Sequence, residues 1–218
     1  MLDQTPEVSP AAELAGDLEP LAERIGSSAS LTALGAAGEA FAFRAPGNVA
    51  ELRDFTRQYQ ARVLLPIELP AISQAFRHAS RSELREILAL DQRLTNEPAL
   101  KDFAVASQHI GRSQLRALRP LRDQRMLQRY LAALARGEAH GWHTVAYGMI
   151  LSLYSLPLRP SLLSYARQTM RGFVFSAAAP LQLRRGVCDD LIDELSGGFP
   201  VAVNALLTAE GLAPLLLT

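Results

Sequence analysis

Apolar residues recur along the chain with the spacing of one face of an α-helix, and they predict helices in nearly every segment. After the turn at Pro46 and Gly47, Asn48 can cap a helix, because Glu51 three residues later completes a capping box. Pro66 should end this helix, since proline lacks a backbone N–H, and a second helix should follow over 68–79. The apolar stripe of the first helix consists of Val49, Leu52, Phe55, Tyr59 and Val63.

Later segments continue the helical pattern. One of them contains Gly111, where a close helix crossing would explain a residue that costs about 1 kcal/mol against Ala inside a helix. The segment 142–154 is apolar on every side, which predicts a helix surrounded by other helices. The remaining amphipathic stretches predict helices over 84–94, 98–118, 125–137, 161–178 and 181–195.

No segment alternates between apolar and polar residues as a strand does, and leucine and alanine dominate the composition. The sequence therefore predicts an all-α fold, a single-domain helical bundle of about eight to ten helices with a buried central helix. We expect an acidic, partly ordered N-terminal segment over 1–25 and the helical domain over 26–218.

The formal net charge is zero, so no overall field attracts nucleic acid or an anionic membrane. The longest apolar run, 145–158, is short for a bilayer, which needs about 20 residues. The acidic N-terminus lacks the basic and apolar regions of a signal peptide. The single cysteine, Cys188, suits a reducing compartment. We therefore expect a cytoplasmic protein with no nucleic-acid or membrane partner.

His140 and His143 lie three residues apart before the apolar run, so two imidazoles on one helix face could reach one metal ion. A zinc or nickel site needs three or four ligands, however, and no carboxylate stands three residues before either histidine. We favour polar residues at the start of a buried helix and predict no metal site. His78 and His109 lie on amphipathic stretches, where we expect surface or boundary positions.

Other reactive or charged groups have simple structural explanations. Cys188 has no partner at a motif spacing, so a small buried side chain is the favoured interpretation over a nucleophile or ligand. Nucleotide-binding, nucleophile-elbow and metalloprotease motifs are missing from the sequence, so we predict no catalytic residue and no cofactor. An acidic cluster, favoured as a solvated face over a cation site, comprises Asp189, Asp190, Asp193 and Glu194. A basic run that could contact phosphate comprises Arg112, Arg116, Arg119, Arg122, Arg125 and Arg129.

Three stretches, taken together in their order and spacing, resemble the urease accessory protein UreF family. "IELPAISQAFRHA" is similar to the family's Asp-Leu-Pro helix, and "LKDFAVASQHIGRSQLRAL" is similar to its Ala-Ser…Met-Gly-Arg pattern. The run from Trp142 to Gln182 resembles its most distinctive region, an aromatic-Gly pair, a long helix and a Pro-Leu-Gly-Gln turn. The residues at these places are Tyr147, Gly148, Leu156, Pro157, Leu158, Leu162, Leu163, Tyr165, Pro180 and Leu181.

The resemblance implies an all-α protein that works by binding and has no activity of its own. UreF-like proteins assemble with a scaffold protein, UreD (also called UreH), and with the GTPase UreG, and the complex helps nickel enter urease apoprotein. A homodimer is also implied. The inherited surface should lie between Tyr165 and Gln182, where three consecutive large side chains, 173–175, cannot all face one core. The interface candidates are Tyr165, Phe173, Phe175, Pro180 and Gln182.

The chain departs from the family pattern at several places. Gln182 stands where the Pro-Leu-Gly-Gln turn has its glycine, and the N-terminal and C-terminal family motifs are largely unmatched. Only Ser27, Ser28, Ala29, Gly38 and Glu39 could be remnants of the N-terminal motif. Two alternatives to urease maturation therefore stay open: a UreF-fold paralogue that serves as a scaffold for other proteins, and an unrelated all-α regulator or enzyme.

Overall fold

The structure is a computed structural model that describes residues 46–118, 121 and 123–212. This part of the chain is 80% helical and contains no strand, which confirms the predicted all-α class. No helix in it is both long and apolar enough to cross a membrane. The predicted 1–25 segment and the remnants of the N-terminal motif lie outside the described residues. The elements are α4 (Val49–Tyr59), η1 (Gln60–Glu68), α5 (Leu69–Ser80), α6 (Leu84–Thr95), η2 (Pro98–Phe103), α7 (Ala104–Ala117), α8 (Arg125–Arg136), α9 (His143–Leu153), α10 (Leu158–Ala178), α11 (Arg185–Ser196) and α12 (Phe199–Ala209).

The first three elements form one continuous helical rod, so the predicted break at Pro66 is wrong. The capping box at its start is confirmed, because Glu51 N–H donates to Asn48 Oδ1 and Asn48 Nδ2 donates to Glu51 Oε1. Pro66 lies inside η1, a π-helix, where Leu69 N–H donates to the carbonyl of Leu64 five residues earlier. This wider turn accommodates a residue without a backbone donor, which would break a tighter helix. The two helices predicted before residue 80 are therefore one continuous helix.

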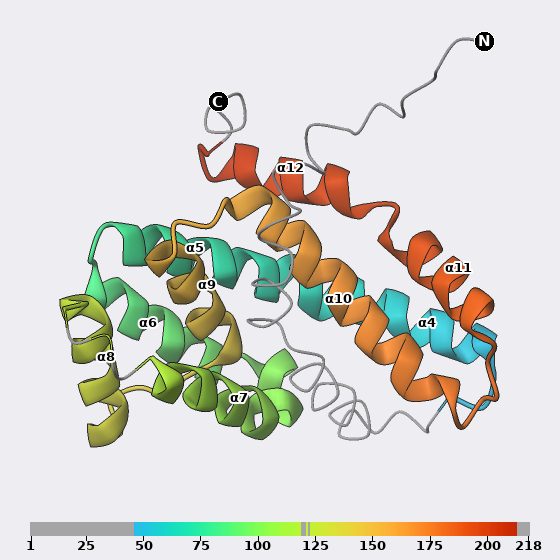
Figure 1. The fold of residues 1–218 in the computed structure, drawn as a ribbon, viewed down its shortest axis with the longest axis horizontal. Helices are drawn as coiled ribbons and strands as arrows, with labels where there is room; N and C mark the ends of the chain where they lie inside the picture. Colours follow the sequence, from blue (N-terminus) through green and yellow to red (C-terminus); the bar gives the residue numbers. More distant parts are fainter. Residues whose placement is uncertain (1–45, 119–120, 122, 213–218) are drawn as a thin grey trace, which may run out of the picture.

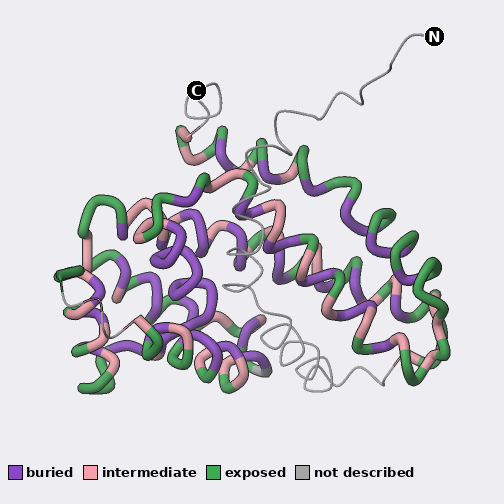
Figure 2. Tube along the Cα trace, in the orientation of Figure 1, coloured by how far each residue is buried: buried purple, intermediate pink, exposed green. Residues whose placement is uncertain are grey.

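Helix α9 is the buried central helix that the sequence predicts. Each residue from His143 to Leu151 is buried, and Figure 2 shows α9 coloured as buried along almost its whole length. α5 and α7 make the most extensive contacts with it. α9 carries no amphipathic stripe because neighbouring helices cover it on several sides.

Two glycines allow neighbouring backbones to approach α9 closely. A Cβ on Gly148 of α9 would lie 2.5 Å from the carbonyl oxygen of Ile72 in α5. A Cβ on Gly111 of α7 would lie 2.2 Å from the carbonyl oxygen of Gly141, just before α9. Both distances are far below van der Waals contact, so only glycine fits. The close contact predicted at Gly111 is therefore confirmed.

Helix α10 joins the two halves of the molecule (Figure 1). It runs from the neighbourhood of α9 toward α4, and it packs against α11, α12, α5 and α4. In the other half α5, α6 and α7 contact α9, and α8 packs against α6. Residues of α10 consequently face either the central core or the surface between α4 and α11.

Candidate functional site: helix α10 and the turn that follows it

Two of the predicted interface residues lie on the buried face of α10. Tyr165 is 4% exposed and Phe173 is 3% exposed, so a partner protein cannot touch either one in this conformation. The Phe173 ring packs edge-on against Phe55 and Tyr59 of α4, with ring centroids 5.2 and 4.7 Å away. Phe173 therefore fixes α10 to α4 rather than forming part of the surface.

Phe175 is the member of the 173–175 trio that faces outward. It is half-buried, whereas Phe173 and Val174 are buried. The Arg171 guanidinium lies over its ring, 5.4 Å from the centroid, which orients both side chains. Phe175 is thus the most exposed member of the trio, although part of its side chain still packs against the core.

The turn after α10 exposes Pro180 and Gln182. Leu183 N–H donates to the carbonyl of Ala178 and Gln182 N–H donates to that of Ala179, the pattern of a Schellman cap. Gln182 adopts a left-handed backbone with φ of 52°, a conformation that favours glycine. Gln182 therefore holds, under local strain, a backbone conformation that a glycine would adopt freely.

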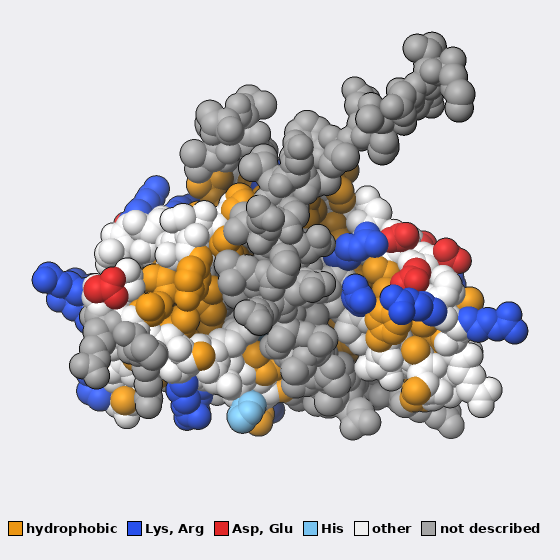
Figure 3. All heavy atoms as spheres, viewed as in Figure 1, with side chains coloured by type: hydrophobic (Ala, Val, Ile, Leu, Met, Phe, Trp, Pro, Cys, Tyr) orange, Lys and Arg blue, Asp and Glu red, His pale blue; other side chains and the backbone are white. Residues whose placement is uncertain are grey.

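Ion pairs hold the neighbouring helices together on this side of the molecule. Glu194 of α11 accepts from Arg53 at 2.9 Å and from Arg57 at 2.8 Å, both from α4. Asp193 accepts from Arg167 of α10 at 2.5 Å. The acidic cluster is thus solvated, as predicted, but two of its members bind arginines from other helices. Figure 3 shows basic and acidic side chains beside apolar surface at the right of the view, where α4, α10 and α11 lie.

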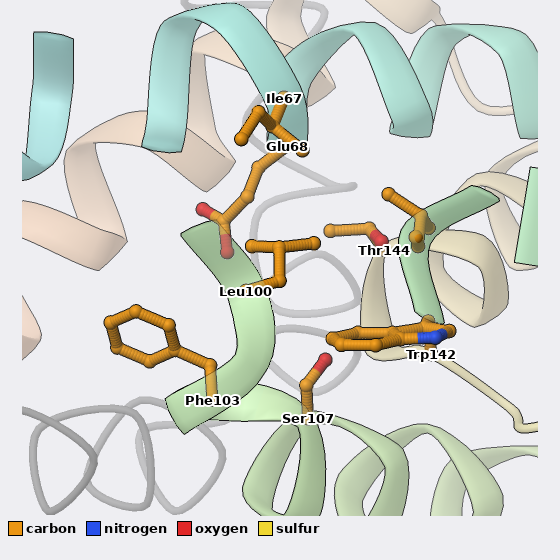
Figure 4. Close-up of a pocket in the computed structure, with 8 residues that line it drawn as sticks. Ile67, Glu68, Leu100, Phe103, Ser107, Trp142 and Thr144 are labelled. Atoms are coloured by element: carbon orange, nitrogen blue, oxygen red, sulfur yellow. The ribbon is translucent and has the colours of Figure 1, made fainter. Parts of the chain in front are cut away.

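A buried polar cluster lies on the inner side of α10. Glu68 from η1 is 6% exposed and faces Tyr59 and Tyr165. Desolvation raises the pKa of Glu68 to about 7, although both tyrosine hydroxyls lower it. The Oε2 atom of Glu68 has no hydrogen-bond partner among the described residues, nor does the Thr144 hydroxyl. Figure 4 shows Glu68 and Thr144 at a small cavity with Ser107 and Trp142, large enough for about one water molecule.

His143 belongs to the same cluster and is a neutral core residue. It is 1% exposed, and burial lowers its pKa to about 4. Its Nδ1 lies 3.1 Å from Gln114 Oε1, and its ring stacks on Tyr165 with centroids 5.9 Å apart. His140 lies in the loop before α9, so the two histidines do not share a helix face. The predicted role of His143 at the start of a buried helix is confirmed.

The other candidate residues lie apart from this region. Cys188 is 1% exposed, and burial raises the pKa of its thiol, which disfavours the reactive thiolate. His78 is half-buried and pairs with Glu83, and His109 is exposed, as expected. No group of three or more histidine, cysteine or acidic side chains in the described ranges could hold a metal ion.

The sequence did not predict that two acidic side chains, Asp91 and Glu68, are buried. Asp91 is 0% exposed and accepts hydrogen bonds from Tyr130 and from the backbone of 140–142. A signal for it exists, since Asp91 shares the apolar stripe of α6 with Ile87 and Leu94. Glu68 similarly stands among apolar residues in "LLPIELPAI".

Comparison with protein-family models matches residues 47–179 to the model of UreF. The match spans α4 through α10 and covers more than half of the chain, including the central helix and the polar cluster. It ends directly before Pro180. No curated protein matches the chain.

Proposed function

The chain belongs to the UreF family, and on this premise we propose that it is a urease accessory protein that acts as a binding scaffold. It assists nickel insertion into urease apoprotein together with a UreD/UreH-like scaffold and a UreG-like GTPase. It works in the cytoplasm and as a homodimer. The family match over residues 47–179 is the observation that carries this proposal.

The architecture supports a binding role. A rigid core places α10 against α4 and α11, so the surface formed by Phe175, Pro180 and Gln182 has a fixed shape. We assign partner binding to this surface, with Tyr165 and Phe173 shaping it from inside rather than touching the partner. Rigid presentation lowers the entropy cost of association.

The test uses a host in which the gene for this chain is deleted and which expresses UreD-like and UreG-like partners and urease apoprotein. The host is compared with and without a plasmid that supplies the chain. Urease nickel content and activity are measured, and complexes are separated by size exclusion. Deletion should leave nickel-poor, inactive urease. Fully nickel-loaded urease in the deletion host would overturn the maturation proposal.

The matched substitutions are Phe175→Asp and Val105→Asp. Phe175→Asp should reduce activation about 10-fold or more while the helical content stays unchanged, because a charge would be buried in the interface. Val105 of α7 is 83% exposed and lies outside the proposed surface, so Val105→Asp should have no effect. Equal effects of the two variants would contradict the assigned surface.

A second candidate function is that of a UreF-fold scaffold for proteins other than urease. Gln182 favours it, because a strained residue replaces the glycine that suits this turn. The deletion experiment separates the two candidates. A normal urease in the deletion host, combined with loss of another complex that Phe175→Asp also disrupts, would favour this second function.

A further inference from the structure

A basic groove lies between α7 and the second half of α8, on a surface distinct from the α10 turn. Its volume is about 510 Å³, and its walls include Arg112 and Arg116 of α7 and Arg136 of α8. Leu131 and Leu134 provide apolar lining and pack against the core. The groove thus combines apolar side chains with guanidinium groups.

The two arginines of α7 are available to a ligand. They are four residues apart and therefore lie on the same helix face. Both are exposed, and neither forms an ion pair with an acidic side chain of the described ranges. Arg136 pairs with Glu138, but both side chains are more than half exposed, so solvent weakens this pair.

The wall of the groove is held in place by the core. Arg112 Nε donates to the carbonyl of His140 at 2.7 Å. The N–H of His140 in turn donates to the buried Asp91 at 2.6 Å. This chain of hydrogen bonds fixes Arg112 and the loop before a ligand arrives, which reduces the entropy lost on binding.

The chemistry of the lining selects the kind of ligand. Arginine pairs with carboxylates through two parallel hydrogen bonds, and leucine contacts apolar side chains. The described residues that line the groove include one imidazole, His140, and no phenylalanine, tyrosine or tryptophan, so they do not form the aromatic platform on which nucleotide bases stack. A free phosphate would bind the arginines and leave Leu131 and Leu134 uncovered.

We propose that this groove binds an acidic amphipathic segment of a partner protein, with its carboxylates on Arg112 and Arg116 and its apolar side chains on Leu131 and Leu134. The inference concerns the groove alone and does not depend on the role in urease maturation.

The test uses the full-length chain and a fluorescein-labelled peptide of about 15 residues with glutamates along one helical face and leucines along the other. Fluorescence anisotropy should show saturable binding that weakens with salt. The double variant Arg112→Glu/Arg116→Glu should lower the affinity about 10-fold or more. Arg112→Lys/Arg116→Lys keeps the charge and should bind with intermediate affinity, because it loses the bidentate geometry.

The control Arg62→Glu/Arg184→Glu changes the net charge equally at two exposed arginines outside the groove. Its affinity should stay within about 2-fold of the wild type. Circular dichroism checks that all variants fold. No binding at low salt, an equal loss in the control, or equal binding of a scrambled peptide would overturn the proposal. Displacement of the peptide by millimolar inorganic phosphate would also overturn it, in favour of a small-anion site.

Discussion

Asp91 and Glu68 are both buried carboxylates, but their surroundings differ. Asp91 accepts four hydrogen bonds, from the Tyr130 hydroxyl at 2.6 Å and from three consecutive backbone N–H groups. Glu68 faces two tyrosine hydroxyls, and its Oε2 has no partner among the described residues. The difference arises from the backbone. The loop at 140–142 precedes α9 and has unused N–H groups, whereas the continuous rod around Glu68 uses its backbone donors internally.

The comparison shows that burial alone does not tell what a carboxylate does. Asp91 fastens the loop before α9 to α6 and α8, so it is a structural group whose loss would leave four donors unsatisfied. Glu68 carries the cost of burial without full compensation, and its pKa of about 7 makes it sensitive to neutral pH. The first site should tolerate no substitution, and the second should tolerate a neutral one.

The largest effect is expected from Asp91→Ala. Removing the carboxylate leaves buried N–H groups and the Tyr130 hydroxyl without an acceptor, which should lower the free energy of unfolding by about 3–5 kcal/mol. Asp91→Asn keeps one acceptor oxygen and should lose less. Urea denaturation measures both variants. A loss below about 1 kcal/mol for Asp91→Ala would remove the distinction between the two sites.

The next effect is a pH dependence set by Glu68. Its pKa is raised from 4.5 to about 7 in the folded protein, so the folded state holds an extra proton between these values. Stability from this group is present at low pH and is lost as the pH rises through 7. Glu68→Gln removes this loss. The free energy of unfolding of the variant, relative to that of the wild type, should therefore rise by about 2–3 kcal/mol from pH 5 to pH 8. A pH-independent difference in urea denaturation would contradict it.

His143 should give an effect of opposite sign. Its pKa is lowered from 6.5 to about 4 by burial, so the folded state holds one proton fewer in that range. Stability from His143 is present above pH 6.5 and is lost as the pH falls toward 4. The free energy of unfolding of His143→Gln, relative to that of the wild type, should rise by about 2 kcal/mol as the pH falls from 7 to 5. Between pH 4.5 and 6.5 the slopes from Glu68 and His143 have opposite signs and nearly cancel, so each single variant should reveal the slope of the group that remains.

The smallest effects separate satisfied from unsatisfied hydroxyls beside the cavity. Ser107 Oγ accepts from the His143 N–H at 3.2 Å, so Ser107→Ala should cost about 1 kcal/mol. The Thr144 hydroxyl has no partner in the described structure, so Thr144→Val should be neutral or stabilise by up to about 1 kcal/mol. Thermal unfolding compares the two variants, and a larger loss for Thr144→Val would show that its hydroxyl is bound, for example to water.

The sequence predicts most of the helices and the buried central helix, because apolar periodicity reports which faces are covered, but no predicted segment includes α12. It fails at Pro66, because a π-helix depends on backbone geometry that no local pattern reveals. It also places Tyr165 and Phe173 at an interface although both are buried. α10 is packed by α4, α5, α11 and α12 along its length, and the number of covered faces is set by tertiary packing.

The enclosure of α9 has a consequence for how the chain is synthesised. When the ribosome has completed α9, the preceding α5 and α7 can already pack on it, but α10 has not yet been made. α10 supplies two contacts to α9. Tyr165 stacks on His143, and the carbonyl of Ser161 accepts a hydrogen bond from the Tyr147 hydroxyl. Until translation reaches α10, part of a mostly apolar helix stays uncovered, which is the kind of surface that nascent chains expose to aggregation and chaperones. A pause in translation between α9 and α10 should therefore lower the yield of folded protein more than a pause after α10.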